Sequence, residues 1–149
     1  MNAPDAELRA STRPDGMVRM RTRDLTFDAQ GSSGAVASAS HASALELLLA
    51  ALAADLVAGF ARAARRAGVS LHDAELRLSA RLENPLMALG VVGETGSPAL
   101  ASVTGTLYVS CDATAAVLPP LWASTLARSP LHATLTRAAS LDIALEVLH

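Results

Sequence analysis

Residues 47–61 carry one charged side chain, Asp55, in a run that otherwise contains only Leu, Ala, Val, Gly and Phe. A helix that is apolar on all sides is a buried helix, because its whole surface avoids water. Burying an unpaired carboxylate is unfavourable, so Asp55 must be paired, hydrated or protonated. At fifteen residues, the run is too short to span a membrane. It therefore predicts a central helix that has a polar group in its middle.

The ends of this helix are marked by capping residues. Ser43 and Glu46 fit the S-x-x-E capping box, which satisfies backbone donors at a helix start. Gly68 can adopt the left-handed conformation that often ends a helix. Cations near the C-terminal end complement the helix dipole, and three are present: Arg62, Arg65 and Arg66. The pattern predicts a helix over residues 44–67.

Other segments alternate apolar and polar residues, which is typical of strands with one buried face. They cover residues 17–23, 75–83, 101–111 and 141–147, and a short continuation lies at 25–27. Such alternation suits a mostly antiparallel sheet. The polar start of the chain indicates a loose tail over residues 1–15, followed by a single domain over residues 16–149.

Shorter helices are expected between the last two strands. Asp112 can cap a helix at residues 113–118, which Pro119 and Pro120 should interrupt. One or two further turns follow at 121–128. Ser129 and Pro130 read as N-cap and first residue of a last helix that runs to Arg137. The whole pattern predicts an α+β fold with helices on one face of the sheet.

Composition excludes several classes of function. The net charge is −2, which argues against a generally basic nucleic-acid binder, and the absence of Lys excludes Schiff-base chemistry. Cys111 is the only cysteine, and no metal-ligand spacing or nucleotide-binding glycine motif is present. The N-terminal residues lack a signal-peptide pattern, so we expect a cytoplasmic protein. Apolar residues make up 51%, which predicts that part of them closes a subunit interface.

Asp55 has two interpretations, a site carboxylate in a pocket or a partly solvated acid at a helix crossing or dimer seam. Glu46 is accounted for by the capping box, and Cys111 by burial as a small hydrophobic residue. His132 follows Ser129 by three residues, but no nucleophile-elbow motif supports a catalytic Ser–His pair. The apolar connection at residues 84–98 predicts a partner surface or a pocket lid.

Three segments resemble the OsmC/Ohr superfamily. The sequence ALELLLAALAAD at residues 44–55 is similar to its central-helix signature, x-E-L-L-x-A-A-L-x-x-C. Residues 61–82, ARAARRAGVSLHDAELRLSARL, resemble the A-R-x-x-G element and the strand that follow there. Residues 128–148, RSPLHATLTRAASLDIALEVL, resemble the C-P-V-x-x-T-L ending and the last strand. The resemblance covers residues 17–149 in the same order.

This resemblance implies an intertwined homodimer, in which the central helices pack together and two pockets lie at the subunit interface. In the family, a peroxidatic cysteine on the central helix attacks an organic hydroperoxide, and a resolving cysteine then forms a disulfide with it. The matching positions here are Asp55 and Ser129, neither of which is a thiol. Leu45 stands where the peroxidase branch has a catalytic Glu, and Glu46 matches the OsmC-like branch instead. Candidates for the family's catalytic arginine are Arg13, Arg19 and Arg21.

These observations leave four hypotheses for the function. The first is an OsmC-like protein without a thiol peroxidase site, which binds a small apolar or weakly polar molecule at the dimer interface. The second is an enzyme that uses Asp55 as a base, assisted by Ser129 or His132. The third is a structural or interaction protein with a filled pocket, and the fourth is a one-cysteine peroxidase that uses Cys111. The candidate ligand-binding residues are Glu46, Arg19, Arg21 and His132. We expect no cofactor, metal, nucleic acid or membrane partner.

A geometric prediction also follows from the resemblance. Residues that replace a disulfide-forming pair should lie close together, so we expect Asp55 near Ser129 in the assembled dimer. The Ser129 hydroxyl can accept a hydrogen bond as a helix cap and donate one to Asp55. We expect Arg19 or Arg21 to supply the countercharge.

Overall fold

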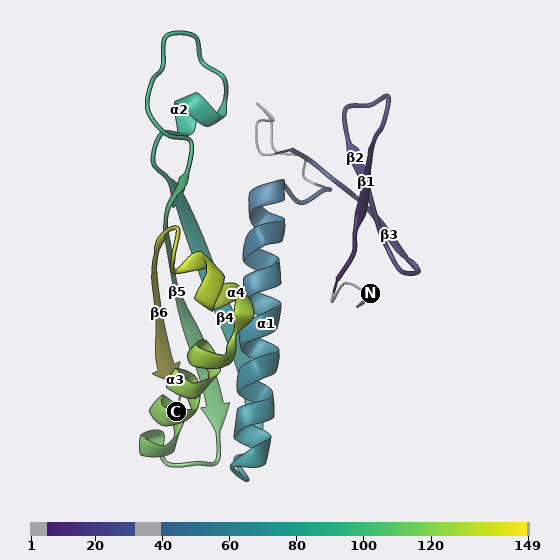
Figure 1. The fold of residues 1–149 in the computed structure, drawn as a ribbon. Helices are drawn as coiled ribbons and strands as arrows, with labels where there is room; N and C mark the ends of the chain where they lie inside the picture. Colours follow the sequence, from purple (N-terminus) through teal and green to yellow (C-terminus); the bar gives the residue numbers. More distant parts are fainter. Residues whose placement is uncertain (1–5, 32–39, 149) are drawn as a thin grey trace, which may run out of the picture.

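The computed structural model describes residues 6–31 and 40–148 of the chain. Two three-stranded sheets and a long helix dominate the fold (Figure 1). The N-terminal sheet contains β1 (Arg9–Thr12), β2 (Val18–Thr22) and β3 (Leu25–Ala29). After it come the long helix α1 (Ala44–Arg66), β4 (Leu71–Leu82), the short helix α2 (Pro85–Ala88) and β5 (Leu100–Cys111). The chain ends with η1 (Ala115–Val117), α3 (Leu118–Arg128), α4 (Pro130–Leu135) and β6 (Ser140–Val147). The predicted α+β fold class is confirmed.

The predicted boundaries of the central helix agree closely with α1. The Ser43 Oγ accepts a hydrogen bond from the Glu46 backbone N–H at 3.2 Å, and the Glu46 carboxylate accepts one from the Ser43 N–H at 2.7 Å. The capping box is therefore present. Gly68 follows the helix with a φ of 72°, in the left-handed region that favours glycine.

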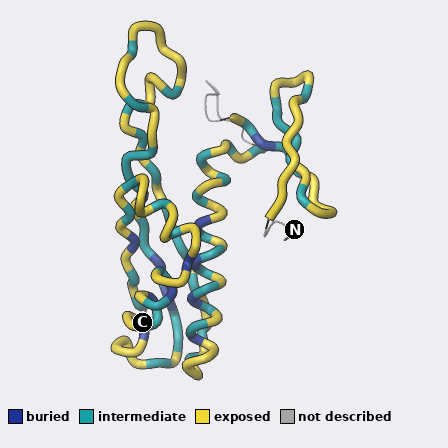
Figure 2. The backbone as a smooth tube through the Cα atoms, viewed as in Figure 1, coloured by how far each residue is buried: buried dark blue, intermediate teal, exposed yellow. Residues whose placement is uncertain are grey.

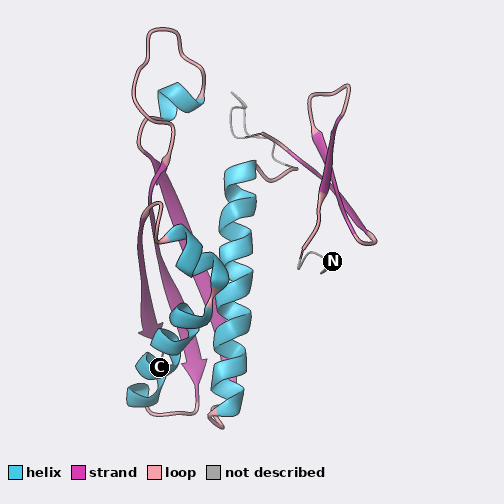
Figure 3. Cartoon of the chain, in the orientation of Figure 1, coloured by secondary structure: helices cyan, strands magenta, loops and turns pink. Residues whose placement is uncertain are grey.

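The second sheet has the order β4-β5-β6 (Figure 3). β4 and β5 form a long antiparallel pair, whereas β5 and β6 are parallel, with η1, α3 and α4 as the crossover between them. Gly105 lies opposite Leu78, where a Cβ atom would be 2.3 Å from the carbonyl oxygen of Arg77. This close approach explains a glycine in the interior of a strand.

Two local predictions are wrong. Arg9–Thr12, in the segment predicted as a tail, pair with β2 and form a strand. Pro119 and Pro120 do not interrupt a helix but lie in the first turn of α3, after a 3-10 turn at Ala115–Val117. The first backbone N–H groups of a helix have no acceptor within it, so proline is tolerated there.

The core lies between the β4-β5-β6 sheet and the helices on one of its faces. Its fully buried side chains come from α1, β5 and α3, and the larger ones are Leu52, Leu56, Phe60, Val103, Leu107, Val109 and Leu118. Trp122 of α3 packs edge-on against Phe60, with ring centroids 5.9 Å apart, and its Nε1 donates to the Ile143 carbonyl at 3.0 Å. This one side chain therefore joins α1, α3 and β6.

α1 is covered on only one side by its own chain. Its buried residues are Leu52, Leu56, Phe60 and Ala64, which recur at the four-residue spacing of one helix face. Figure 2 shows exposed and half-buried residues along the rest of the helix. At 23 residues, α1 is long and apolar enough to cross a membrane by length and composition alone. The predicted burial of the helix on all sides is thus not met within a single chain.

The apolar connection after β4 forms α2 and a loop at the far end of the β4–β5 hairpin (Figure 1). Asn84 caps α2 by accepting hydrogen bonds from the backbone N–H groups of Leu86 and Met87. The large apolar side chains of this connection are exposed, and Val92 is 99% exposed. None of the residues of this connection lines the cavity between α1 and α3 that is described below.

Candidate functional site

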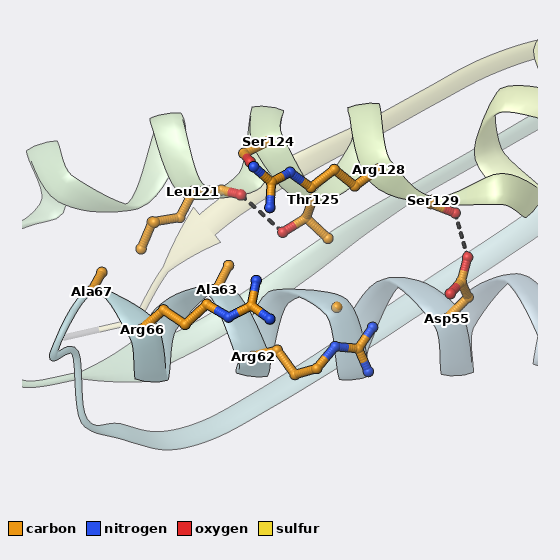
Figure 4. Close-up of a pocket in the computed structure, with 11 residues that line it drawn as sticks. Asp55, Arg62, Ala63, Arg66, Ala67, Leu121, Ser124, Thr125, Arg128 and Ser129 are labelled. Carbon is orange, nitrogen blue, oxygen red and sulfur yellow. Dashed lines mark hydrogen bonds between the residues drawn. The ribbon is translucent and has the colours of Figure 1, made fainter.

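A cavity of about 350 Å³ lies between α1 and α3 (Figure 4). Its size falls in the lower part of the range for small-molecule sites. α1 and the residue after it provide one wall, with Asp55, Gly59, Arg62, Ala63, Arg66 and Ala67. α3 and the residue after it provide the other, with Leu121, Ser124, Thr125, Arg128 and Ser129.

Asp55 and Ser129 meet at one end of this cavity (Figure 4). The Ser129 hydroxyl donates to Asp55 Oδ2 at 2.5 Å, although 74 residues separate the two in sequence. The same oxygen accepts a hydrogen bond from the His132 backbone N–H at 3.0 Å and so caps α4. The predicted contact and the predicted double use of the hydroxyl are both confirmed, and a single chain suffices to form them.

A close approach of the two helices shapes the cavity. A Cβ atom at Gly59 would lie 3.2 Å from the Thr125 methyl carbon, a tight contact. Glycine at this position therefore lets α1 approach α3 without displacing that side chain. The Thr125 hydroxyl donates to the Leu121 carbonyl of its own helix at 2.8 Å, so its proton is not available to a ligand.

Three exposed arginines line the cavity: Arg62, Arg66 and Arg128. From the sequence, Arg62 and Arg66 were predicted only to complement the helix dipole, although helical spacing puts them on the same side of α1 as Asp55. Arg128 was missed, although it directly precedes Ser129. The signal that could have found it is this adjacency to a predicted site residue.

Arg19 and Arg21 do not reach the cavity of their own chain. Arg19 pairs with Asp28 on the neighbouring strand, with Nε 2.9 Å from Oδ1. The hydrogen bond from Arg19 holds the pKa of the Asp28 carboxyl below its usual value. Arg13 contacts the same carboxylate at 2.8 Å, so two of the three candidate arginines already have an acidic partner. Arg21 lies on β2 and is exposed.

The other predicted residues also lie outside the lining of the cavity. Glu46 takes part in the capping box, and the hydrogen bond from the Ser43 backbone lowers the pKa of its carboxyl. His132 reaches Ser129 through its backbone N–H. Cys111 is half-buried at the end of β5, with Sγ 3.9 Å from the Ala113 carbonyl oxygen. In residues 6–31 and 40–148, no three His, Cys, Asp or Glu residues gather closely enough to hold a metal ion.

Solved structures share this architecture over almost the whole chain. An OsmC-like protein from Mycoplasma pneumoniae superposes with a TM-score of 0.82 at 14% identity, over 98% of this chain and 99% of that one. The chain has the OsmC fold. An OsmC-like protein of unknown function from Vibrio cholerae gives a TM-score of 0.74 at 11% identity, with 98% and 100% of the two chains covered.

The fold extends to proteins named for peroxide resistance. The organic hydroperoxide resistance protein OhrB of Bacillus subtilis superposes with a TM-score of 0.62 at 17% identity, over 96% of this chain and 97% of that one. No family model matches the sequence, and no curated protein matches it. The resemblance seen in three short motifs is therefore supported by the shared fold and not by overall sequence identity.

Replacing Ser129 tests the hydrogen bond that joins the two walls of this OsmC-fold cavity. Ser129→Ala should lower the free energy of unfolding by about 1–3 kcal/mol, because it removes a helix cap and leaves the Asp55 carboxylate without its donor. Urea denaturation measures the change. Ser124→Ala, which alters the same cavity wall, is the control and should change stability by less than about 0.5 kcal/mol. Equal effects of the two substitutions would contradict the role given to Ser129.

Proposed function

We propose that this chain is a stress-response protein of the OsmC/Ohr superfamily that has no thiol peroxidase site and binds a small molecule in the cavity beside Asp55 and Ser129. The hydrogen bond between these two residues carries the proposal. It lies where the resemblance puts the two family cysteines, and neither oxygen-bearing side chain can form a sulfenate or a disulfide. The cavity remains although the groups for thiol chemistry are replaced.

Acid–base catalysis by this pair is less well supported. Ser129 is 4% exposed, and its oxygen already accepts one hydrogen bond and donates another. A nucleophile needs access to its substrate and a base that removes its proton. Asp55 accepts the hydrogen bond of the Ser129 hydroxyl and is placed as such a base, but the buried hydroxyl lacks access to a substrate. In the described residues, His132 hydrogen-bonds the Ser129 oxygen through its backbone N–H, which cannot take up a proton. The site is therefore proposed for binding.

Peroxidase assays test the proposal. We expect the protein to consume cumene hydroperoxide with dithiothreitol no faster than the dithiol alone, because the thiol positions hold Asp55 and Ser129. The Cys111→Ser variant should behave identically, since Cys111 packs against the core away from the cavity. Turnover in the unmodified protein that disappears in Cys111→Ser would contradict the proposal and would assign the activity to Cys111 instead.

We also propose that the protein is a cytoplasmic homodimer, in which the open side of α1 packs on a second copy. The apolar residues on that side are exposed and recur every three or four positions: Leu48, Ala51, Ala54 and Ala58. A stripe of this kind fits the interface between two identical helices better than it fits water. Ala58 lies one turn from Arg62, so the second copy would border the cavity.

Light scattering of the purified protein without detergent tests the dimer. We expect a mass of twice 15.3 kDa at micromolar concentration. Ala51→Glu should shift the protein towards monomer, because it puts a charge into the apolar stripe. The control is Ala116→Glu, an exposed alanine of η1, which should leave the mass unchanged. A folded monomer, or a protein that requires detergent because α1 enters a membrane, would contradict this arrangement.

A further inference from the structure

The cavity combines three cations with a single anion. Arg62 and Arg66 reach it from α1 and Arg128 from α3, whereas Asp55 is the only acidic residue in its lining. Figure 4 shows guanidinium groups from both helices at this one cavity. Among the described residues, no acidic side chain forms an ion pair with any of the three arginines.

Such a cluster is unfavourable without a counterion. Arg62 and Arg66 are four residues apart on one helix, and like charges at that spacing repel each other. Favourable interaction with the helix dipole explains an arginine at the end of α1 and another at the end of α3. It does not explain why the two helices bring their cations to the same cavity.

The Asp55 carboxylate does not neutralise the cluster. Its Oδ2 accepts the hydrogen bond from Ser129 at the end of the cavity, which positions the carboxylate against α4. One carboxylate also leaves at least two of the three guanidinium charges uncompensated. Guanidinium groups bind phosphate and carboxylate through paired N–H donors, so the part of the cavity that these arginines line is suited to an oxyanion.

The remainder of the cavity lining is suited to the hydrocarbon part of a ligand. Ala63, Ala67 and Leu121 present aliphatic groups to the same space, and Gly59 adds no side chain. A ligand that satisfies both parts must carry a charged oxygen group and a short apolar portion. The volume of about 350 Å³ admits a small organic molecule rather than a peptide or a nucleic acid.

We propose that the cavity binds a small organic oxyanion, a phosphate monoester or carboxylate with an aliphatic portion, through Arg62, Arg66 and Arg128. This rests on the proposed binding function and gives it a ligand class. The oxyanion lies among the guanidinium groups, and the aliphatic portion contacts Ala63, Ala67 and Leu121. Asp55 repels a negative group at its own end of the cavity, so the bound oxyanion is oriented away from it.

Three probes with the same carbon chain test this inference: octyl phosphate, octanoate and octanol. Isothermal titration calorimetry on the full-length protein should show both anions binding at least about tenfold more tightly than octanol, because charged hydrogen bonds are lost with the alcohol. A higher affinity for octyl phosphate than for octanoate would identify phosphate as the preferred group, and the reverse order would identify carboxylate. Raising the salt concentration should weaken both anions and leave octanol unaffected.

Variants locate the binding to the cavity. Arg66→Gln and Arg128→Gln should each weaken the two anions by about three- to tenfold, a range that allows for screening of exposed charges. The matched control is Arg65→Gln, which removes the same charge from the neighbouring position of α1, outside the cavity lining. Circular dichroism of each variant confirms that the fold is retained.

The outcomes separate this inference from the function on which it rests. Equal affinity for octanol and the two anions would overturn the oxyanion site and leave an apolar binding cavity. Absence of binding by all three probes would overturn both the inference and the binding function. An equal loss of anion affinity in Arg65→Gln would show unspecific attraction to a basic surface and would also overturn the inference.

Discussion

A helix that is apolar on all sides must pack against other elements on every side. The chain itself buries only one face of α1. The sheet and α3 bury the face that carries Leu52, Leu56 and Phe60. Trp122 fixes this packing, because it contacts Phe60 and donates a hydrogen bond to β6. The position of α3 against α1 then determines where a cavity can exist. The open face of α1 leaves room for the second copy that we propose.

Asp55 is compatible with this helix because the fold supplies a donor for it. Ser129 is held at the start of α4 by its capping role, so its hydroxyl is already ordered when it donates to Asp55. The carboxylate thus avoids the cost of being buried without a partner. The same hydrogen bond joins the two residues that the resemblance aligns with the family's cysteines. We therefore propose a binding cavity without thiol chemistry, in which the arginines select the ligand.

Much of the fold could be predicted because local patterns and tertiary packing agree. The capping box at Ser43 and the alternation in β5 define their elements almost to the residue, whereas β4 begins at Leu71, before the predicted start at residue 75. The two prolines of α3 misled the prediction, since their effect depends on whether they lie in the first turn or the interior. β1 was missed because its residues are all exposed, so no apolar alternation marks the strand.

The site was predicted only in part. The contact of Asp55 with Ser129 followed from the resemblance, because disulfide-forming positions must be adjacent in space. The arginines of the cavity did not follow, since a cation near a helix end has a sufficient local explanation in the helix dipole. Only the packing of α1 against α3, through Gly59 and Thr125, shows that these cations share one space.

The most direct test of the account is to place cysteines at both positions. The double variant Asp55→Cys/Ser129→Cys, prepared with Cys111→Ser, should form a disulfide within one chain when oxidised, because the side chains at these two positions reach each other within one chain and the positions match a disulfide-forming pair in the resemblance. Mass spectrometry of a protease digest without reductant identifies the linked peptides, and a denaturing gel without reductant distinguishes bonds within and between chains. An intrachain bond in a folded protein is the predicted result. A folded variant in which the two cysteines stay reduced, or link only between chains, would contradict the account.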